Sequence, residues 1–117
     1  MKVVYKNKKI QKLCTNIVEA KRKYGPDVGY ALIKLSILLE NADNLKDVSG
    51  YPQYRLHQLK GDKKDQYSIT ILKSSKYRLI IYPLDEDENV LKSFDNEMLM
   101  FVRCVCIKIE EVSEHYE

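Results

Sequence analysis

The segment 66–82 constrains the fold most, because apolar and polar residues alternate twice along it. Two strand-like runs, 66–72 and 77–82, are separated by the short polar sequence KSSK, so we expect them to pair as an antiparallel hairpin. Successive side chains of a strand point to opposite faces of a sheet. One face would carry Tyr67, Ile69, Ile71, Tyr77, Leu79 and Ile81, and the other Ser68, Thr70 and Arg78.

The first third of the chain follows a helical period instead. After a short strand at 3–5, apolar residues recur at helical spacing from Lys8 until Gly25 and Pro26 end the segment. Pro26 suits the first turn of a second helix, and Asp27 suits its positive end. The first helix would bury Ile10, Leu13, Cys14, Ile17 and Val18, and the second Val28, Ala31, Leu32, Leu35, Leu38, Leu39 and Ala42.

Two further apolar residues, Ile33 and Ile37, fall beside the stripe of the second helix. Either the two helices pack broadly on each other, or this edge docks a partner protein. The sequence leaves both open. Residues 41–44 close the second helix, and 47–52 are expected to form a connecting loop.

Strands are then expected at about 53–60, 66–72, 77–82 and 100–109. The last of them is apolar on both faces except at Arg103 and Lys108, which indicates a central strand. The predicted fold class is α+β, in the order β-α-α-β-β-β-β. The helical hairpin would pack on one face of a mostly antiparallel sheet and leave the other face open to solvent.

An acidic insert at about 84–99 separates the last two strands. It holds six acidic residues and one lysine, whereas the remaining chain has 19 basic and 11 acidic residues. A basic body of this kind favours an anionic partner. A turn of helix is expected around residues 90–94, and the acidic run lacks the spaced ligands and glycine of a calcium loop.

A length of 117 residues suits a single domain, 1–117. The chain has no apolar run of about 18 residues, so no membrane span is expected. It also lacks an apolar secretion signal, which favours a cytoplasmic location. Its three cysteines make no disulfide framework; Cys104 and Cys106 are expected to be buried thiols, and no metal or other cofactor is predicted.

Basic residues and a histidine gather around the predicted hairpins. The basic side chains are Arg55, Lys60, Lys63, Lys64, Lys73, Lys76 and Arg78. His57 precedes Lys60 by three residues, and strict alternation would put them on opposite faces unless Gly61 relaxes the strand. Such a surface suits phosphate binding and proton transfer. If the last strand pairs beside 77–82, His115 and Tyr116 would reach the open face near Arg78.

These residues form a longer motif. The segment 56–69 reads LHQLKGDKKDQYSI and resembles the LHxLKGD(K/R)xx(Q/Y)(W/Y)SI signature of HigB-type toxins, which belong to the RelE/ParE superfamily. Residues 77–80, YRLI, resemble the aromatic-arginine strand of that family. Residues 111–116 resemble its closing acidic, tyrosine and histidine motif, although this chain reads Glu-His-Tyr where the family commonly reads Asp-Tyr-His. The acidic insert is also longer than is typical of the family.

The resemblance implies a RelE-like fold and the toxin of a type II toxin–antitoxin system. Such a toxin cleaves mRNA on the ribosome and is silenced by a HigA-type antitoxin, through which it is linked to operator DNA. Carried over to this chain, the RNA-cutting residues would be His57, Lys60, Arg78, His115 and Tyr116. We expect Arg55, Lys63, Lys64, Lys73 and Lys76 to hold the RNA backbone, and Ile33 and Ile37 to offer an antitoxin contact.

Two rivals keep the fold and drop the catalysis. ParE-like relatives poison DNA gyrase by protein binding, and an inactive member would bind only its antitoxin and regulate transcription with it. The two histidines and the LHxLKGD signature favour the nuclease, because a gyrase-binding protein needs no such pair.

Overall fold

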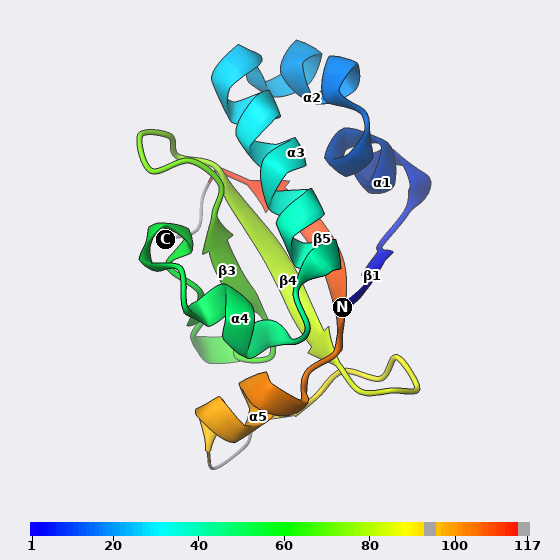
Figure 1. Cartoon of the computed structure of the whole chain (residues 1–117), viewed down its shortest axis with the longest axis vertical. Coiled ribbons are helices and arrows are strands. Elements are labelled where there is room, and N and C mark those ends of the chain that lie inside the picture. The colour runs from blue at the N-terminus through cyan, green and yellow to red at the C-terminus, as the bar shows by residue number, and fades with distance from the viewer. Residues whose placement is uncertain (93–95, 115–117) are drawn as a thin grey trace.

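The chain folds into a mixed α+β structure, as its periodicities predict (Figure 1). The computed structural model describes residues 1–92 and 96–114; positions 93–95 and 115–117 lie outside the description. The sheet is formed by β1 (Lys2–Tyr5), β2 (His57–Gln58), β3 (Tyr67–Thr70), β4 (Arg78–Leu84) and β5 (Cys106–Ser113), in the spatial order β1-β5-β4-β3-β2. β1 pairs with β5 in parallel and the other pairs are antiparallel, so the sheet is mostly antiparallel, as expected.

The described helices are α1 (Lys8–Thr15), α2 (Ile17–Tyr24), α3 (Pro26–Asn41), α4 (Leu45–Ser49) and α5 (Glu97–Arg103). Short 3-10 turns occupy Pro52–Tyr54 and Gly61–Lys63. In Figure 1, α3 lies in front of β5 and beside β4, with α2 above it, α1 to its right, and α4 and α5 below. No helix within the described ranges has the length and apolar character needed to cross a membrane.

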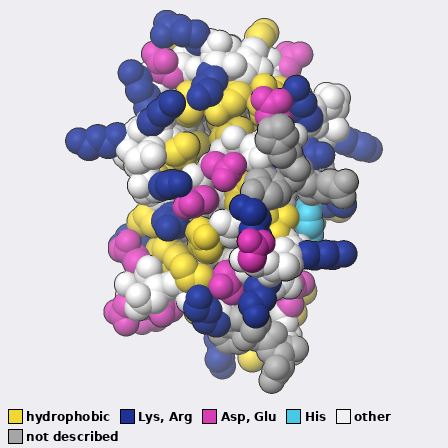
Figure 2. Space-filling view, turned by 180° about the vertical axis from the view of Figure 1, so that it is seen from behind, with side chains coloured by type: hydrophobic (Ala, Val, Ile, Leu, Met, Phe, Trp, Pro, Cys, Tyr) yellow, Lys and Arg dark blue, Asp and Glu magenta, His cyan; other side chains and the backbone are white. Residues whose placement is uncertain are grey.

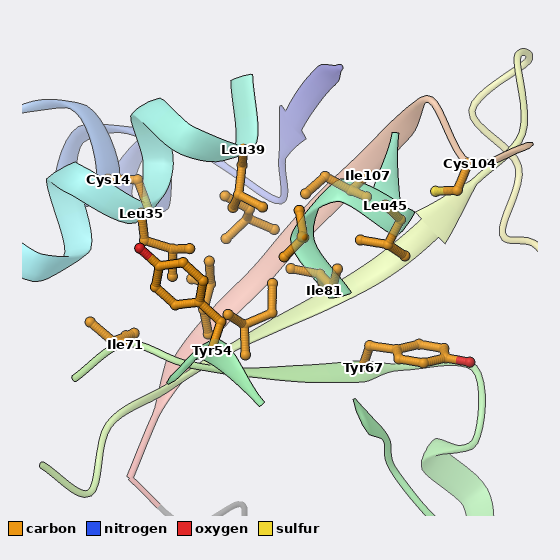
Figure 3. Packing of buried hydrophobic residues seen from close by; sticks show 14 of the residues in the cluster. Cys14, Leu35, Leu39, Leu45, Tyr54, Tyr67, Ile71, Ile81, Cys104 and Ile107 are labelled. Atoms are coloured by element: carbon orange, nitrogen blue, oxygen red, sulfur yellow. The ribbon is translucent and has the colours of Figure 1, made fainter. Parts of the chain in front are cut away.

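The core forms between α3 and one face of the sheet (Figure 3). Leu32, Leu35 and Leu39 of α3 are fully buried against strand residues such as Ile81 and Ile107. These three leucines have the spacing i, i+3 and i+7, so they lie on one face of α3. The predicted apolar stripe of the second helix is thereby confirmed. The strand alternation is confirmed too: Tyr67, Ile69, Ile71, Leu79 and Ile81 all belong to this core.

The predicted first helix is wrong in one respect, because it is two helices. Asn16 has an extended backbone, ends α1, and accepts a hydrogen bond on its side chain from the Glu19 N–H at 3.1 Å. An asparagine at this position is a preferred N-cap, so it starts a new helix in a new direction. Ile17 and Val18, expected in the core, are therefore 38% and 60% exposed.

The predicted strand at 53–60 shrinks to β2, His57–Gln58. Pro52 begins a 3-10 turn that Arg55 ends in the left-handed region, and this backbone is incompatible with a continuous strand. Upstream, the expected loop 47–52 contains the end of α4, whose N-cap Asn44 accepts a hydrogen bond from the Asp47 N–H.

The predicted strand 100–109 is also wrong in its first half. Asn96 caps α5 by accepting a hydrogen bond from the Leu99 N–H, and β5 begins only at Cys106. Met100 and Phe101 are buried while Met98 and Val102 are about half exposed, so this apolar run is a one-sided helix and not a two-sided strand. The helical turn expected around 90–94 is not at Val90, which forms a bridge with Leu84; part of that range lies outside the described residues.

The second face of the sheet carries the polar alternation, but it is not simply open to solvent as predicted. Ser68 and Ile80 are fully buried, and Thr70 is 6% exposed. Gln66 donates to the Tyr82 hydroxyl at 2.8 Å, and the Lys108 ammonium lies 4.9 Å from the centre of the Tyr82 ring. This face is therefore a partly buried polar layer, so a hollow in it is a candidate binding site.

Candidate functional site

His57 lies on the edge strand β2, directly opposite Ser68 of β3. Its Nδ1 is 2.8 Å from the carbonyl oxygen of Arg55. Because a carbonyl oxygen can only accept, Nδ1 carries the proton in this contact. The other ring nitrogen, Nε2, is then the proton acceptor of the neutral ring, as a general base requires.

The carbonyl that holds His57 comes from an uncommon backbone conformation. Arg55 has φ 43° and ψ 51°, in the left-handed region that non-glycine residues seldom adopt. This conformation ends the 3-10 turn begun at Pro52 and directs the chain into β2. Backbone strain of this kind costs on the order of 1 kcal/mol or more and is often found at functional sites.

A cleft of about 550 Å³ opens beside this turn. Its wall is built by segments far apart in the sequence: the 3-10 turn, the end of β3, the loop after it and the start of β4. The lining residues are Pro52, Gln53, Arg55, Thr70, Lys73 and Arg78. Three of the predicted basic residues, Arg55, Lys73 and Arg78, thus face one hollow, which makes it a strongly cationic place.

The Arg78 guanidinium is held by backbone carbonyl groups at this cleft. One guanidinium nitrogen, Nη1, donates to the carbonyl oxygens of Ser75 and Tyr77, both at 3.0 Å. Its Nε is buried without a hydrogen-bond partner among the described residues. A guanidinium has five N–H donors, so the two carbonyls orient it and leave donors for a bound anion.

His57 and the cleft share one face of the sheet. Paired residues of neighbouring antiparallel strands point the same way, so His57 lies on the face of Ser68, and Arg78 on the face of its partner Thr70. Ser68 and Thr70 are two residues apart on β3, a rise of roughly 7 Å. His57 and Arg78 lie on the two strands that flank β3, so about 10 Å across the sheet also separates them.

The other predicted basic residues are not brought into this cleft. Lys60 is exposed at the start of the Gly61–Lys63 turn and shares no hydrogen bond with His57 in the described part of the chain. Lys63 lies within that turn. Lys64 lines a separate small pocket with Gln58 and Tyr67.

Lys76 is engaged elsewhere: its ammonium lies 2.8 Å from the carboxylate of Glu114. The hydrogen bond to this carboxylate raises the pKa of Lys76 above its ordinary value. The pair joins the loop before β4 to the residue just after β5. This ion pair makes the Lys76 ammonium less available to a bound anion.

The expected pairing of the last strand with the 77–82 strand is confirmed, with Ser113 of β5 opposite Arg78. His115 and Tyr116 themselves lie outside the described residues. Of the two predicted antitoxin contacts, Ile37 is 55% exposed on α3, whereas Ile33 is only partly exposed.

Three residues that line the cleft, Pro52, Gln53 and Thr70, are not among the predicted site residues. Thr70 had a readable signal, because alternation already placed it on the polar face with Arg78. Gln53 had none, because the segment around it was expected to be a strand and its turn depends on tertiary contacts.

Residues of the acidic insert contact the signature segment 56–69. Lys92 pairs with Asp65 at 3.2 Å, and the Tyr67 hydroxyl donates to the Glu97 carboxylate at 2.8 Å. Burial, aided by this carboxylate, raises the pKa of Tyr67. Within the described ranges, no three His, Cys, Asp or Glu side chains come together to hold a metal ion.

The two cysteines expected to be buried are confirmed as core thiols. Cys104 and Cys106 are 0% and 3% exposed, and the Cys104 thiol donates to the Cys106 carbonyl oxygen at 3.2 Å. Cys104 lies at the end of α5, however, and not on the strand.

Comparisons of the chain with protein-family models, with curated proteins and with solved structures found no match.

Proposed function

We propose that this protein is the toxin of a type II toxin–antitoxin system, a HigB-type endoribonuclease with a RelE-like fold that cleaves mRNA on the ribosome. The observation that carries the proposal is the cationic cleft of Arg55, Lys73 and Arg78 beside His57. The resemblance to an RNA-cutting signature predicts His57 and Arg78 as site residues. The basic residues of the hairpins predict Arg55 and Lys73 as RNA contacts, and the three cations line one hollow. The order of the elements, one strand, helices and four strands with α5 inserted before the last, is compatible with the RelE-like part of the proposal.

The proposed reaction uses the RNA itself as nucleophile. The 2′-oxygen attacks the adjacent phosphorus as its proton is removed, and the bond from phosphorus to the 5′-oxygen breaks. The products are a 2′,3′-cyclic phosphate and a 5′-hydroxyl, with the leaving oxygen taking up a proton. One base and one acid are needed, and together they contribute roughly 10²–10⁴-fold or more to rate.

His57 suits the base, because its contact with the Arg55 carbonyl leaves Nε2 as the acceptor. The same contact would hold the ring in place once it becomes positively charged. The acid is assigned to His115, with Tyr116 as the poorer alternative, since both follow β5 where Ser113 pairs with Arg78.

The cations have a separate role in the proposal. Charge on the phosphoryl oxygens rises in the transition state, and fixed donors aimed at it are often the largest catalytic contribution. Arg78, oriented by two carbonyls, suits this role. Lys60, the lysine of the signature, lies outside the cleft that Arg78 lines. Arg55 and Lys73 would hold neighbouring phosphates, which confers affinity without sequence preference.

The proposal includes partners and a place. A HigA-type antitoxin would neutralise the toxin and connect it to operator DNA, and the exposed Ile37 on α3 is its candidate contact. Ribosomes and mRNA place the activity in the cytoplasm.

The test is primer extension on a translated mRNA, with and without ribosomes, for the wild type, His57→Ala and Lys46→Ala. Lys46 lies exposed on α4 and serves as the matched surface control. We expect ribosome-dependent cuts that fall at least about 100-fold in His57→Ala and persist in Lys46→Ala. Full cleavage by a folded His57→Ala protein would contradict the assignment. No cleavage by the wild type while growth still stops would redirect the proposal to a protein target such as DNA gyrase.

A further inference from the structure

A second hollow lies between α1 and α2, built from residues that the proposed cleavage does not use. Its volume is about 370 Å³. The lining residues are Lys9, Lys12, Leu13, Glu19, Arg22 and Lys23. Asn16, whose extended backbone ends α1 and caps α2, lies between the two helices that line the hollow.

The interior of this α1–α2 groove is mainly apolar although five of its six lining residues are charged. Long lysine and arginine side chains bury their methylene stems and keep their charged ends in water. Lys12 and Arg22 fit this description, with side chains 63% and 69% exposed. The groove therefore has an aliphatic floor that includes Leu13, and a rim of positive charge.

The charge of the rim is strongly one-sided. Residues 8–24 hold six basic residues and one acidic residue, Glu19. That carboxylate lies 2.9 Å from Arg22 and 3.9 Å from Lys12, so it orders two cations and neutralises only one charge. Val18 adds an exposed apolar side chain on the same helix. Figure 2 shows this end of the molecule with hydrophobic side chains framed by Lys and Arg.

We propose that the α1–α2 groove docks an acidic amphipathic segment of a partner protein. Apolar side chains of the segment enter the groove, and its carboxylates meet the cationic rim. Complementary charge speeds such encounters and selects the partner, while burial of the apolar side chains holds it. The inference does not depend on the proposed cleavage of RNA.

Two other anionic partners fit less well. None of the described residues that line the groove is aromatic, so RNA bases would find no ring on which to stack. A lipid surface is flat and favours a long protruding apolar face, whereas this floor is recessed between two helices of eight residues each.

The test uses a fluorescein-labelled peptide with leucine and glutamate at amphipathic helical spacing, and measures its binding to the full chain by fluorescence anisotropy. The test variant is Lys9→Glu with Lys23→Glu. The matched control is Lys34→Glu with Lys46→Glu, which changes the net charge equally at exposed sites outside the groove. We expect the groove variant to weaken binding at least about tenfold, and the control no more than about twofold. Replacing the leucines of the peptide by serine should also abolish binding.

Equal weakening by both double variants would overturn the proposal, because the attraction would then be one of net charge alone. Single-stranded RNA and vesicles containing phosphatidylserine are tested in parallel. Suppose that RNA or the vesicles bind the wild type and lose that binding in the groove variant, while the peptide binds neither the wild type nor a variant. The partner is then not an acidic protein segment. Cleavage of mRNA should be unchanged in the groove variant, so failure here is distinguishable from failure of the proposed function.

Discussion

At the scale of single residues, Arg55 performs two tasks through two different groups. Its backbone, at φ 43°, presents the carbonyl that holds the His57 ring, and its side chain lines the cationic cleft. One residue thus joins the candidate base to the candidate phosphate site. The left-handed conformation turns the chain from the Pro52–Tyr54 turn into β2 within two residues, Arg55 and Leu56.

Gly29 has the tightest packing requirement among the four glycines. A Cβ there would lie 2.5 Å from the backbone nitrogen of Lys21, because α2 and α3 touch at this point. Gly29→Ala should therefore destabilise the protein by about 1–3 kcal/mol, since backbone atoms must move. The measurement is the free energy of unfolding in urea.

Gly50→Ala is the matched control for this prediction. Its Cβ would meet the nearest atom at 3.4 Å, and its φ of −74° suits any residue. The free energy of unfolding of the Gly50→Ala variant should stay within about 0.5 kcal/mol of the wild-type value. Equal losses from both substitutions would show that the contact between α2 and α3 is not the cause.

At the scale of elements, the break between α1 and α2 creates the second candidate binding surface. Asn16→Ala removes the acceptor for the Glu19 N–H and should cost about 1 kcal/mol of unfolding free energy. Asn16→Asp keeps an acceptor and should remain near the wild type. Urea midpoints of the two variants decide this, and an Asp variant as unstable as the Ala variant would contradict the capping role.

The edge strand β2 is held by few contacts. Only His57 and Gln58 pair with β3, and the pairing ends with the Leu59 N–H on the Gln66 carbonyl. The Gly61–Lys63 turn is closed by backbone hydrogen bonds, and the Gln58 side chain donates to the carbonyl of Lys64 just after it. Asp65, which follows the turn, also pairs with Lys92 of the insert.

At the scale of the whole molecule, positive and negative charges lie in separate regions of the surface. The cleft beside His57 and the rim of the α1–α2 groove are cationic. The acidic run Asp85–Glu88 forms a turn after β4, in which the Asp85 carboxylate accepts hydrogen bonds from the Asp87 and Asn89 N–H groups. Lys2 of β1 pairs with Glu88 at 2.8 Å. The acidic run is thereby held at the β1 end of the sheet and does not line the cationic cleft.

The buried thiols predict a loss of stability in alkali. Burial raises the pKa of Cys14 to about 12 and that of Cys104 to about 11, from an ordinary 9.0. Above pH 9 the unfolded chain therefore releases protons that the native state keeps, so stability falls as pH rises toward 11. The fall should approach about 1.4 kcal/mol per pH unit for each thiol.

Unfolding in urea under reducing conditions, between pH 8.5 and 11, measures this dependence. Cys104→Ala should show a shallower slope whatever its absolute stability. A wild-type stability that stays level from pH 9 to 11 would contradict the burial of these thiols.

Sequence alone determined the features that are encoded locally. The helical stripe of α3, the alternation of β3 and β4, the α+β class and the polar face that carries Thr70 and Arg78 all follow from side-chain periods of 3.6 and 2. The basic residues of the cleft were also found, because their charge and their place in or beside the signature are properties of the chain.

Only the tertiary structure decided which of these residues meet. The apolar run at 100–109 fits a buried strand and a one-sided helix equally well, and only packing of Met100 and Phe101 against the core selects the helix α5. The same holds for the site. The Pro52–Tyr54 turn, which Arg55 ends, lies beside the β3–β4 hairpin, so Arg55 lines one cleft with Lys73 and Arg78. Lys60 is not among the residues that line it, and Lys64 lines a different pocket. Such choices depend on contacts between residues distant in sequence, and a local pattern contains no information about them.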